Sequence, residues 1–116
     1  MSLTPPTIVR DVSGLTDEQK DRIRDFLQGA VYCWCKNRRG EWFSMRDLMG
    51  GDNFHWQGTP LIALYEKQCN AGVPSSEAIV QAGKESGWLL KSVISRDTRS
   101  FETKEEELIR KYRWKP

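Results

Sequence analysis

The chain has 116 residues, of which 38% are hydrophobic and 29% are charged, and its formal net charge at pH 7 is +2. This composition is typical of one globular domain, and a chain of this length can bury a modest core without crosslinks. No apolar run approaches the roughly 20 residues that a transmembrane helix needs, and the start of the chain lacks the parts of a signal peptide. These features exclude membrane insertion, and the odd number of cysteines, three, predicts reduced thiols in the cytoplasm.

Residues 1–14 are rich in Pro, Thr and Ser, which predicts a flexible arm ahead of a single helical domain over residues 15–116. The domain opens with a long helix, whose N-terminus is marked by Thr16 and Gln19 at the spacing of a capping box. The apolar stripe of this helix runs into the basic stretch 36–39 and then a glycine. That order is typical of the C-terminal end of a helix.

The middle of the chain alternates short helical patterns with glycine-rich breaks. We expect a short helix over residues 45–50, a glycine-rich loop, and a second helix over residues 60–70 that begins at a Thr-Pro pair. Two further helical patterns cover residues 76–83 and 88–96. Gly87 either separates these two helices or only punctuates one longer helix.

After Asp97 the helical pattern stops, and two short strands around the polar stretch 103–107 predict a hairpin. A helix over residues 104–112 is the alternative, because that stretch has strong helix formers and Glu-to-Lys or Glu-to-Arg pairs at helical spacing. The predicted fold class is mainly α (α+β), with four to five helices and a short C-terminal β-hairpin. The predicted core residues are Ile23, Phe26, Leu27, Ala30, Val31, Trp34, Leu48, Leu61, Leu64, Leu90, Val93 and Ile94.

The cysteines and the single histidine do not form a recognisable metal or catalytic motif. Cys33 and Cys35 lie two residues apart in a helical pattern, where their side chains point about 200° apart and cannot share a metal. His55 lies near Asp52 in a glycine-rich loop, but the sequence has no nucleophile motif, no C-x-x-C pair and no P-loop. We therefore predict that the protein is not an enzyme and has no metal site and no cofactor, and that its thiols pack as small apolar groups.

The distribution of cations is more informative than the small net charge. Residues 36–39 hold three cations and no acid, and the chain ends in a second basic run after Leu108. The order of a long helix, a short extended segment at residues 41–43, further helices and a hairpin resembles that of a winged-helix domain. In such domains a recognition helix enters the major groove of DNA and the hairpin, or wing, contacts the backbone.

A helix-turn-helix can be placed in two ways. Helices 45–50 and 60–70 are separated by about nine residues, which is longer than the usual turn. Helices 76–83 and 88–96 are joined tightly around residues 84–87, which suits the motif better. The polar residues that this second placement would direct outward are Ser86, Lys91, Ser92, Ser95 and Arg96.

The leading hypothesis is a small DNA-binding or regulatory module of winged-helix or helix-turn-helix type. A homodimer through the first helix would allow it to reach two half-sites. Lysine, arginine and serine are residue types that contact phosphates and base edges. The predicted nucleic-acid contacts are Arg38, Arg39, Lys91, Ser92, Arg96, Arg99, Lys111 and Arg113.

The alternative hypothesis is an adaptor that binds another protein and no nucleic acid. Its surface would consist of the aromatic residues Trp42, Phe54 and Trp56, which flank the short helix and the glycine-rich loop. The two hypotheses predict different geometries. Cations that converge on one face favour DNA, whereas scattered cations and an exposed aromatic patch favour a protein partner.

Overall fold

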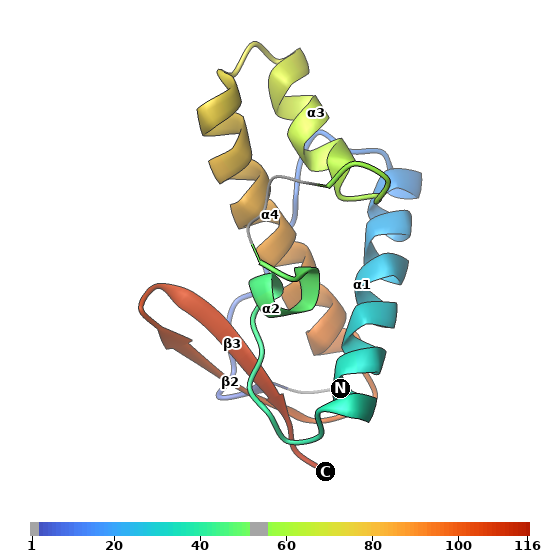
Figure 1. Ribbon diagram of the computed structural model, residues 1–116, viewed down its shortest axis with the longest axis vertical. Coiled ribbons are helices and arrows are strands. Elements are labelled where there is room, and N and C mark those ends of the chain that lie inside the picture. The colour runs from blue at the N-terminus through green and yellow to red at the C-terminus, as the bar shows by residue number, and fades with distance from the viewer. Residues whose placement is uncertain (1–2, 52–55) are drawn as a thin grey trace.

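A computed structural model describes residues 3–51 and 56–116 of the chain. Four helices are found over these residues: α1 (Asp17–Asn37), α2 (Met45–Met49), α3 (Ile62–Asn70) and α4 (Ser75–Arg96). Three strands, β1 (Leu3–Thr4), β2 (Phe101–Glu106) and β3 (Ile109–Trp114), form one sheet in the order β1-β2-β3. Figure 1 shows the four helices above and beside the β2–β3 hairpin, which lies at the same end of the molecule as both chain termini. The predicted α+β fold class with a C-terminal hairpin is confirmed.

The predicted capping box at the start of α1 is present. The Thr16 hydroxyl accepts from the Gln19 amide at 3.1 Å, and the Gln19 side chain accepts from the Thr16 amide at 2.9 Å. The helix ends at Asn37, so the basic run extends beyond it into the following turn. Gly40 adopts a left-handed φ of 79° in that turn rather than directly after the last helical residue.

Residues 76–83 and 88–96 belong to one continuous helix, α4, so a helix-turn-helix around residues 84–87 is not formed. A glycine inside a helix costs about 1 kcal/mol relative to alanine. At Gly87 that cost is offset by burial of the turns beside it, because Ser86 is 0% exposed and Leu89 and Leu90 are each 1% exposed. The tight connection lies instead between α3 and α4, which run in opposite directions from it (Figure 1).

The C-terminal hairpin closes through a two-residue turn. Glu107 and Leu108 both have positive φ, 52° and 65°, as a type I′ turn requires. The strands pair in register from Phe101 opposite Trp114 to Glu106 opposite Ile109. The stretch that was also compatible with a helix is therefore extended.

Both edges of the hairpin are covered by segments that are distant in sequence. At the β2 edge, β1 pairs in parallel, with Leu3 opposite Phe101. At the β3 edge, Phe43 and Tyr112 exchange two backbone hydrogen bonds of 2.8 Å. Unpaired edges invite pairing with other chains, and these two contacts reduce that exposure.

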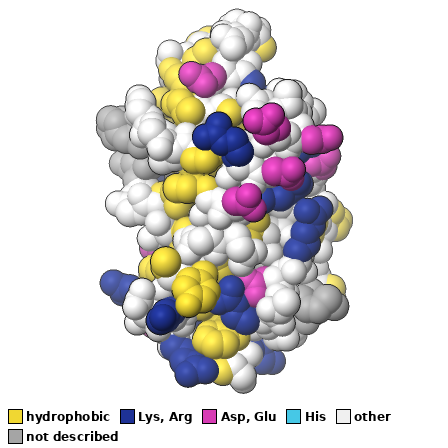
Figure 2. Space-filling view, turned by 90° about the vertical axis from the view of Figure 1, so that its right-hand side faces the viewer, with side chains coloured by type: hydrophobic (Ala, Val, Ile, Leu, Met, Phe, Trp, Pro, Cys, Tyr) yellow, Lys and Arg dark blue, Asp and Glu magenta, His cyan; other side chains and the backbone are white. Residues whose placement is uncertain are grey.

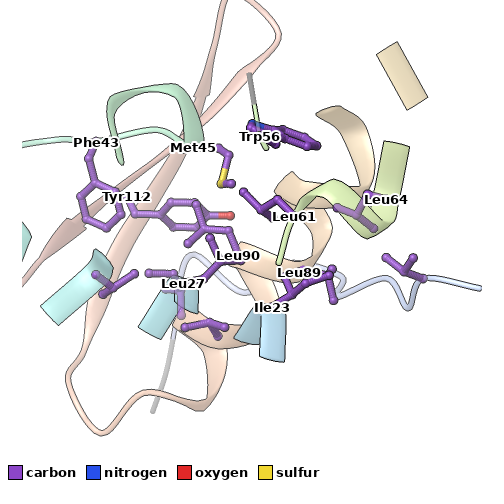
Figure 3. Packing of buried hydrophobic residues seen from close by; sticks show 14 of the residues in the cluster. Ile23, Leu27, Phe43, Met45, Trp56, Leu61, Leu64, Leu89, Leu90 and Tyr112 are labelled. Carbon is purple, nitrogen blue, oxygen red and sulfur yellow. The ribbon is translucent and has the colours of Figure 1, made fainter. Parts of the chain in front are cut away.

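The core lies where the helices meet the hairpin. Figure 3 shows Leu27 from α1, Leu64 from α3, Leu90 from α4 and Tyr112 from β3 pointing into one cluster, and each is at most 1% exposed. Of the predicted core residues, eight are buried: Ile23, Leu27, Val31, Leu61, Leu64, Leu90, Val93 and Ile94. The other four are only partly buried at the margin: Phe26, Ala30, Trp34 and Leu48.

The described part of the N-terminal arm contacts the domain along its length. Leu3 and Thr4 form β1, Val12 is 1% exposed in the core, and the Lys67 ammonium donates to the Ser13 carbonyl. The Thr7 hydroxyl accepts a hydrogen bond from Lys91 on α4. Residues that the sequence places in a separate arm thus form one wall of the surface described next.

Candidate functional site

A groove with a volume of about 750 Å³ lies between α4 and the hairpin. We call it the α4–hairpin groove. The arm closes one side and α2 contributes Met45 and Arg46. Along α4 the lining includes Gly83 and Gly87, and a Cβ added at Gly87 would meet no other atom within 4 Å. Small residues on α4 therefore keep the groove open.

The groove is lined by five cations and one acid. The acid is Glu105, and one oxygen of its carboxylate lies 3.6 Å from the guanidinium of Arg110. The other four cations have no carboxylate within 4 Å among residues 3–51 and 56–116. These four unpaired cations are Arg10, Arg46, Lys84 and Lys91.

Lys91 is the groove cation most constrained by its surroundings. Its partly buried ammonium donates to the Thr7 hydroxyl at 2.5 Å. Burial lowers the pKa of Lys91, and the positive charges of Arg110 and Arg10 lower it further, against a smaller opposing effect of Glu105. Positive charge is therefore concentrated around this ammonium, which favours an anion as ligand.

The rim of the same groove is apolar. Five large hydrophobic residues are exposed over the described part of the chain, and three of them line the groove: Ile8 (74% exposed), Val80 (56%) and Leu108 (92%). A ligand that fills the groove would thus meet cations along its walls and apolar side chains at its margins.

The outer face of the hairpin presents the opposite electrostatic arrangement. Successive strand residues point to opposite faces, so Lys104, Lys111 and Arg113 point away from the groove. Arg113 contacts Glu102 at 2.5 Å, Lys111 contacts Glu106 at 2.8 Å, and Lys104 contacts Glu106 at 3.4 Å. The hydrogen bond from Arg113 lowers the pKa of Glu102, which keeps this carboxylate charged.

Three further predicted cations, Arg38, Arg39 and Arg99, lie at the C-terminal end of α1, where each is close to an aromatic ring. Arg38 lies 5.0 Å from the ring centroid of Trp34, and Arg39 lies 4.8 Å from that of Trp114. Arg99 lies 5.9 Å from the Trp114 centroid and 6.0 Å from that of Tyr32. Figure 2, which shows the α1 side, has Lys and Arg gathered at this lower end and most Asp and Glu in the upper half.

Arg99 also holds a buried carboxylate. The Asp97 side chain is 2% exposed and accepts three hydrogen bonds of 2.8 Å from Arg99, one of them from its backbone amide, and a fourth of 2.8 Å from Gln28. Burial raises the pKa of Asp97, but these hydrogen bonds outweigh burial and the pKa lies below its ordinary value. Asp97 therefore stabilises the join between α4 and β2 as a carboxylate.

The predicted contacts consequently fall on separate surfaces. Only Lys91 lines the α4–hairpin groove, while Lys111 and Arg113 lie on the outer face of the hairpin and Arg96 is exposed at the end of α4. Ser92, expected to face outward, is 3% exposed and donates to the Leu89 carbonyl at 2.7 Å. The expectation failed for Ser92, and for Ser86 as well, because both lie on the buried side of α4.

The predicted aromatic surface is not assembled as expected either. Trp56 is 4% exposed and belongs to the same buried cluster as Met45 and Leu61 (Figure 3). Trp42 is partly buried under the cations of Lys104 and Arg113, at 4.3 and 4.8 Å from its ring centroid. Phe54, the third predicted residue, lies outside the described residues, as do His55 and Asp52.

The thiols differ in their environments. Cys35 is buried, as predicted, and burial raises its pKa, which disfavours the thiolate. Cys33 is exposed and Cys69 is intermediate, so the prediction that the thiols pack as apolar groups fails for Cys33. Over residues 3–51 and 56–116, no three His, Cys, Asp or Glu residues are grouped closely enough to hold a metal ion.

Four of the five groove cations were missed by the sequence reasoning: Arg10, Arg46, Lys84 and Arg110. They come from the arm, α2, α4 and β3, and no two of them are adjacent in sequence. The one signal available is the pair of small residues on α4, Gly83 and Gly87, one turn apart. Small residues on one helical face are typical of a close approach or an open surface.

Comparison with models of protein families, with curated proteins and with solved structures found no match. Within the part of the chain that the structure describes, no helix combines the length and the apolar composition that a membrane span requires.

Proposed function

We propose that the chain is a small DNA-binding module of winged-helix type that binds duplex DNA through the cations of the α4–hairpin groove. The observation that carries this proposal is the set of four groove cations without a carboxylate partner among the described residues. Such cations contribute affinity by displacing the counterions condensed on DNA. Cations already paired with carboxylates contribute less, because their charge is locally neutralised.

The connectivity supports the same proposal. A long helix, α4, leads into the hairpin, and Phe43, between α1 and α2, pairs with β3. This resembles the winged-helix order of helix, strand, helices and wing, and α4 would be the recognition helix. Lys84 and Lys91 lie seven residues apart on the groove side of α4, which is about 10 Å along the helix. That distance spans about three base pairs at 3.4 Å per step, so the two cations would contact different phosphates.

The predicted contacts outside the groove have a secondary role in this proposal. Arg96 extends the basic surface at the end of α4, whereas Arg38, Arg39 and Arg99 lie at the C-terminal end of α1. A homodimer would bring a second groove to a second half-site. A cytoplasmic location agrees with three cysteines that form no disulfide.

The experiment compares two triple variants of equal charge change. The groove variant is Arg46→Gln/Lys84→Gln/Lys91→Gln, and the control, on the outer face of the hairpin, is Lys104→Gln/Lys111→Gln/Arg113→Gln. Each is titrated against a random-sequence duplex at several salt concentrations. The wild-type affinity should fall steeply with salt, and the slope of log K against log salt should be smaller by about three in the groove variant, about one for each lost contact.

The outer-face variant should keep most of the wild-type slope. Equal losses of affinity in both variants would show that only the total charge of the protein matters. The groove would then not be the DNA-binding surface. A wild-type protein that does not bind duplex DNA at low salt would overturn the proposal itself.

A second candidate function follows from the apolar rim. An acidic peptide with apolar side chains would match both the groove cations and the exposed Ile8, Val80 and Leu108. This would be an adaptor without nucleic acid, with its surface moved from the aromatic loop to the groove. Binding of such a peptide by a protein that ignores duplex DNA would favour it.

A further inference from the structure

Thr7, Arg10, Lys91 and Arg110 all line the α4–hairpin groove. The Lys91 ammonium donates to the Thr7 hydroxyl, and the charges of Arg10 and Arg110 both act on it. The guanidinium carbon of Arg10 lies 5.8 Å from the ring centroid of Trp88 on α4. Two elements far apart in sequence, the arm and β3, thus bring guanidinium groups toward one half-buried lysine.

The arm is fixed on both sides of this cluster. Before Thr7, Leu3 and Thr4 pair with Phe101 and Glu102 of β2. After Arg10, Val12 is buried in the core at 1% exposure. The segment between these anchors lines the groove, so Thr7 and Arg10 are held in place before any ligand arrives. Preorganised groups lose less entropy on binding.

The cluster is electrostatically incomplete. Glu105 is the one carboxylate among the described residues that line the groove, and it lies 3.6 Å from Arg110. Like charges gathered in a partly buried place raise the free energy of the folded protein, because protein screens them less than water does. A bound anion would relieve this repulsion. The Lys91 ammonium donates one hydrogen bond to Thr7 and has further N–H groups that can donate to an anion.

We propose that Thr7, Arg10, Lys91 and Arg110 form a binding pocket for a phosphate group. Phosphate fits better than a carboxylate, because two guanidinium groups, an ammonium and a hydroxyl offer more donors than two carboxylate oxygens can accept, and arginine binds phosphate through paired hydrogen bonds. The phosphate comes from the DNA backbone, and in this respect the inference rests on the proposed function. Free phosphate or a nucleotide would present the same chemistry.

The test follows the Lys91 side chain by NMR, with selective labelling of the lysine ε-carbons and assignment by Lys91→Gln. The intact protein is titrated with inorganic phosphate, with acetate and with a short duplex. Arg10→Gln is compared with Lys111→Gln, which removes one charge from the outer face of the hairpin. Phosphate should shift the Lys91 signal at lower concentration than acetate does, and Arg10→Gln should weaken that response severalfold, whereas Lys111→Gln should not.

Binding should also raise the pKa of Lys91 from its lowered value, because a neighbouring anion favours the ammonium. The affinity should therefore fall as pH rises through the pKa of the free pocket, with a proton taken up on binding. Arg10, Arg110 and Glu105 are the charged groups that act on Lys91.

The possible outcomes separate the pocket from the proposed function. Duplex binding that Lys91→Gln and Arg10→Gln leave unchanged would overturn the pocket while the module still binds DNA. A Lys91 response to inorganic phosphate without duplex binding would support the pocket, identify a free phosphate compound as its ligand and overturn the DNA proposal. A signal that responds to neither would overturn both.

Discussion

The outer face of the C-terminal hairpin and the α4–hairpin groove carry the same types of cation in different electrostatic states. On the outer face, Lys104, Lys111 and Arg113 each lie within 3.4 Å of a glutamate oxygen. Around the groove, the described residues offer Glu105 alone to five cations. A count of lysine and arginine in the sequence does not distinguish these two surfaces. They differ in how many of their cations are paired with a carboxylate.

The difference separates two roles for a surface cation. A paired cation mainly fixes local geometry and adds little at an exposed site, where such pairs contribute about 0–1 kcal/mol. An unpaired cation in a concave place keeps its charge available for a ligand, and the concavity focuses the field. The folded chain therefore has one surface built for binding and another whose charges are satisfied internally.

The largest effect is expected at the most buried of the paired carboxylates, Asp97. Asp97→Asn should lower the free energy of unfolding by about 2–3 kcal/mol, because Arg99 and Gln28 would lose a charged acceptor that is 2% exposed. The value lies toward the lower end for broken buried pairs because the Arg99 side chain keeps 21% exposure. Urea denaturation at pH 7 measures the change.

The matched control for this variant is Glu41→Gln. Its partner Arg38 lies at 3.8 Å and both side chains are more than half exposed, so the expected change is below about 0.5 kcal/mol. Since the pKa of Asp97 is lowered in the folded state, its contribution is present at neutral pH and is lost as pH falls through that lowered pKa. The gap between wild type and Asp97→Asn should therefore close on acidification. A gap that stays constant would contradict the assignment to charge.

The next effect concerns the turn that joins β2 to β3. Glu107 and Leu108 have positive φ without being glycine, and Leu108 is 92% exposed, so it gains little from packing. Glu107→Asn/Leu108→Gly should raise the free energy of unfolding by about 1 kcal/mol, because both residues are replaced by ones that tolerate this turn. Glu107→Gln/Leu108→Ala keeps both β-carbons and should show no such gain. A loss of stability in the first variant would show that Leu108 makes contacts that the fold needs.

The smallest effect tests whether a cation must lie in the groove, or only lack a carboxylate partner, to contribute to DNA binding. Glu105→Gln removes the one groove carboxylate and should tighten duplex binding about threefold at low salt, since less negative charge faces the DNA. Glu102→Gln frees Arg113 on the outer face, and should change affinity less than about twofold. Fluorescence anisotropy with one labelled duplex measures both. Equal gains would mean that free charge anywhere on the hairpin contributes to binding.

The parts of the fold that depend on residues close together in the sequence were predictable. Thr16 and Gln19 locate the start of α1, and the alternation after Asp97 predicts strands even though residues 104–112 contain strong helix formers. In that stretch, pairing of β3 with both β2 and Phe43 outweighs helix propensity. Gly87 was ambiguous, because the burial that keeps α4 continuous depends on side chains from other elements.

The candidate site was much less predictable. Lys91 was identified from its residue type, but its partner Thr7 lies 84 residues earlier in a segment read as a flexible arm. The groove exists only after the arm, α2, α4 and β3 have come together, so no local pattern encodes it. The basic run at residues 36–39 was conspicuous in sequence, yet Arg38 and Arg39 lie against Trp34 and Trp114 at the opposite end of α1 from its cap.

The central claim is that the groove, and not the outer face of the hairpin or the end of α1, binds DNA. The most direct measurement is the change in backbone amide NMR signals when a short duplex is added at low salt. The largest changes should fall on residues 79–91 of α4, on residues 105–110 and on Thr7 to Arg10, and salt should reverse them. Changes centred instead on Lys111 and Arg113, or on Arg39, Arg99 and Trp114, would contradict the account.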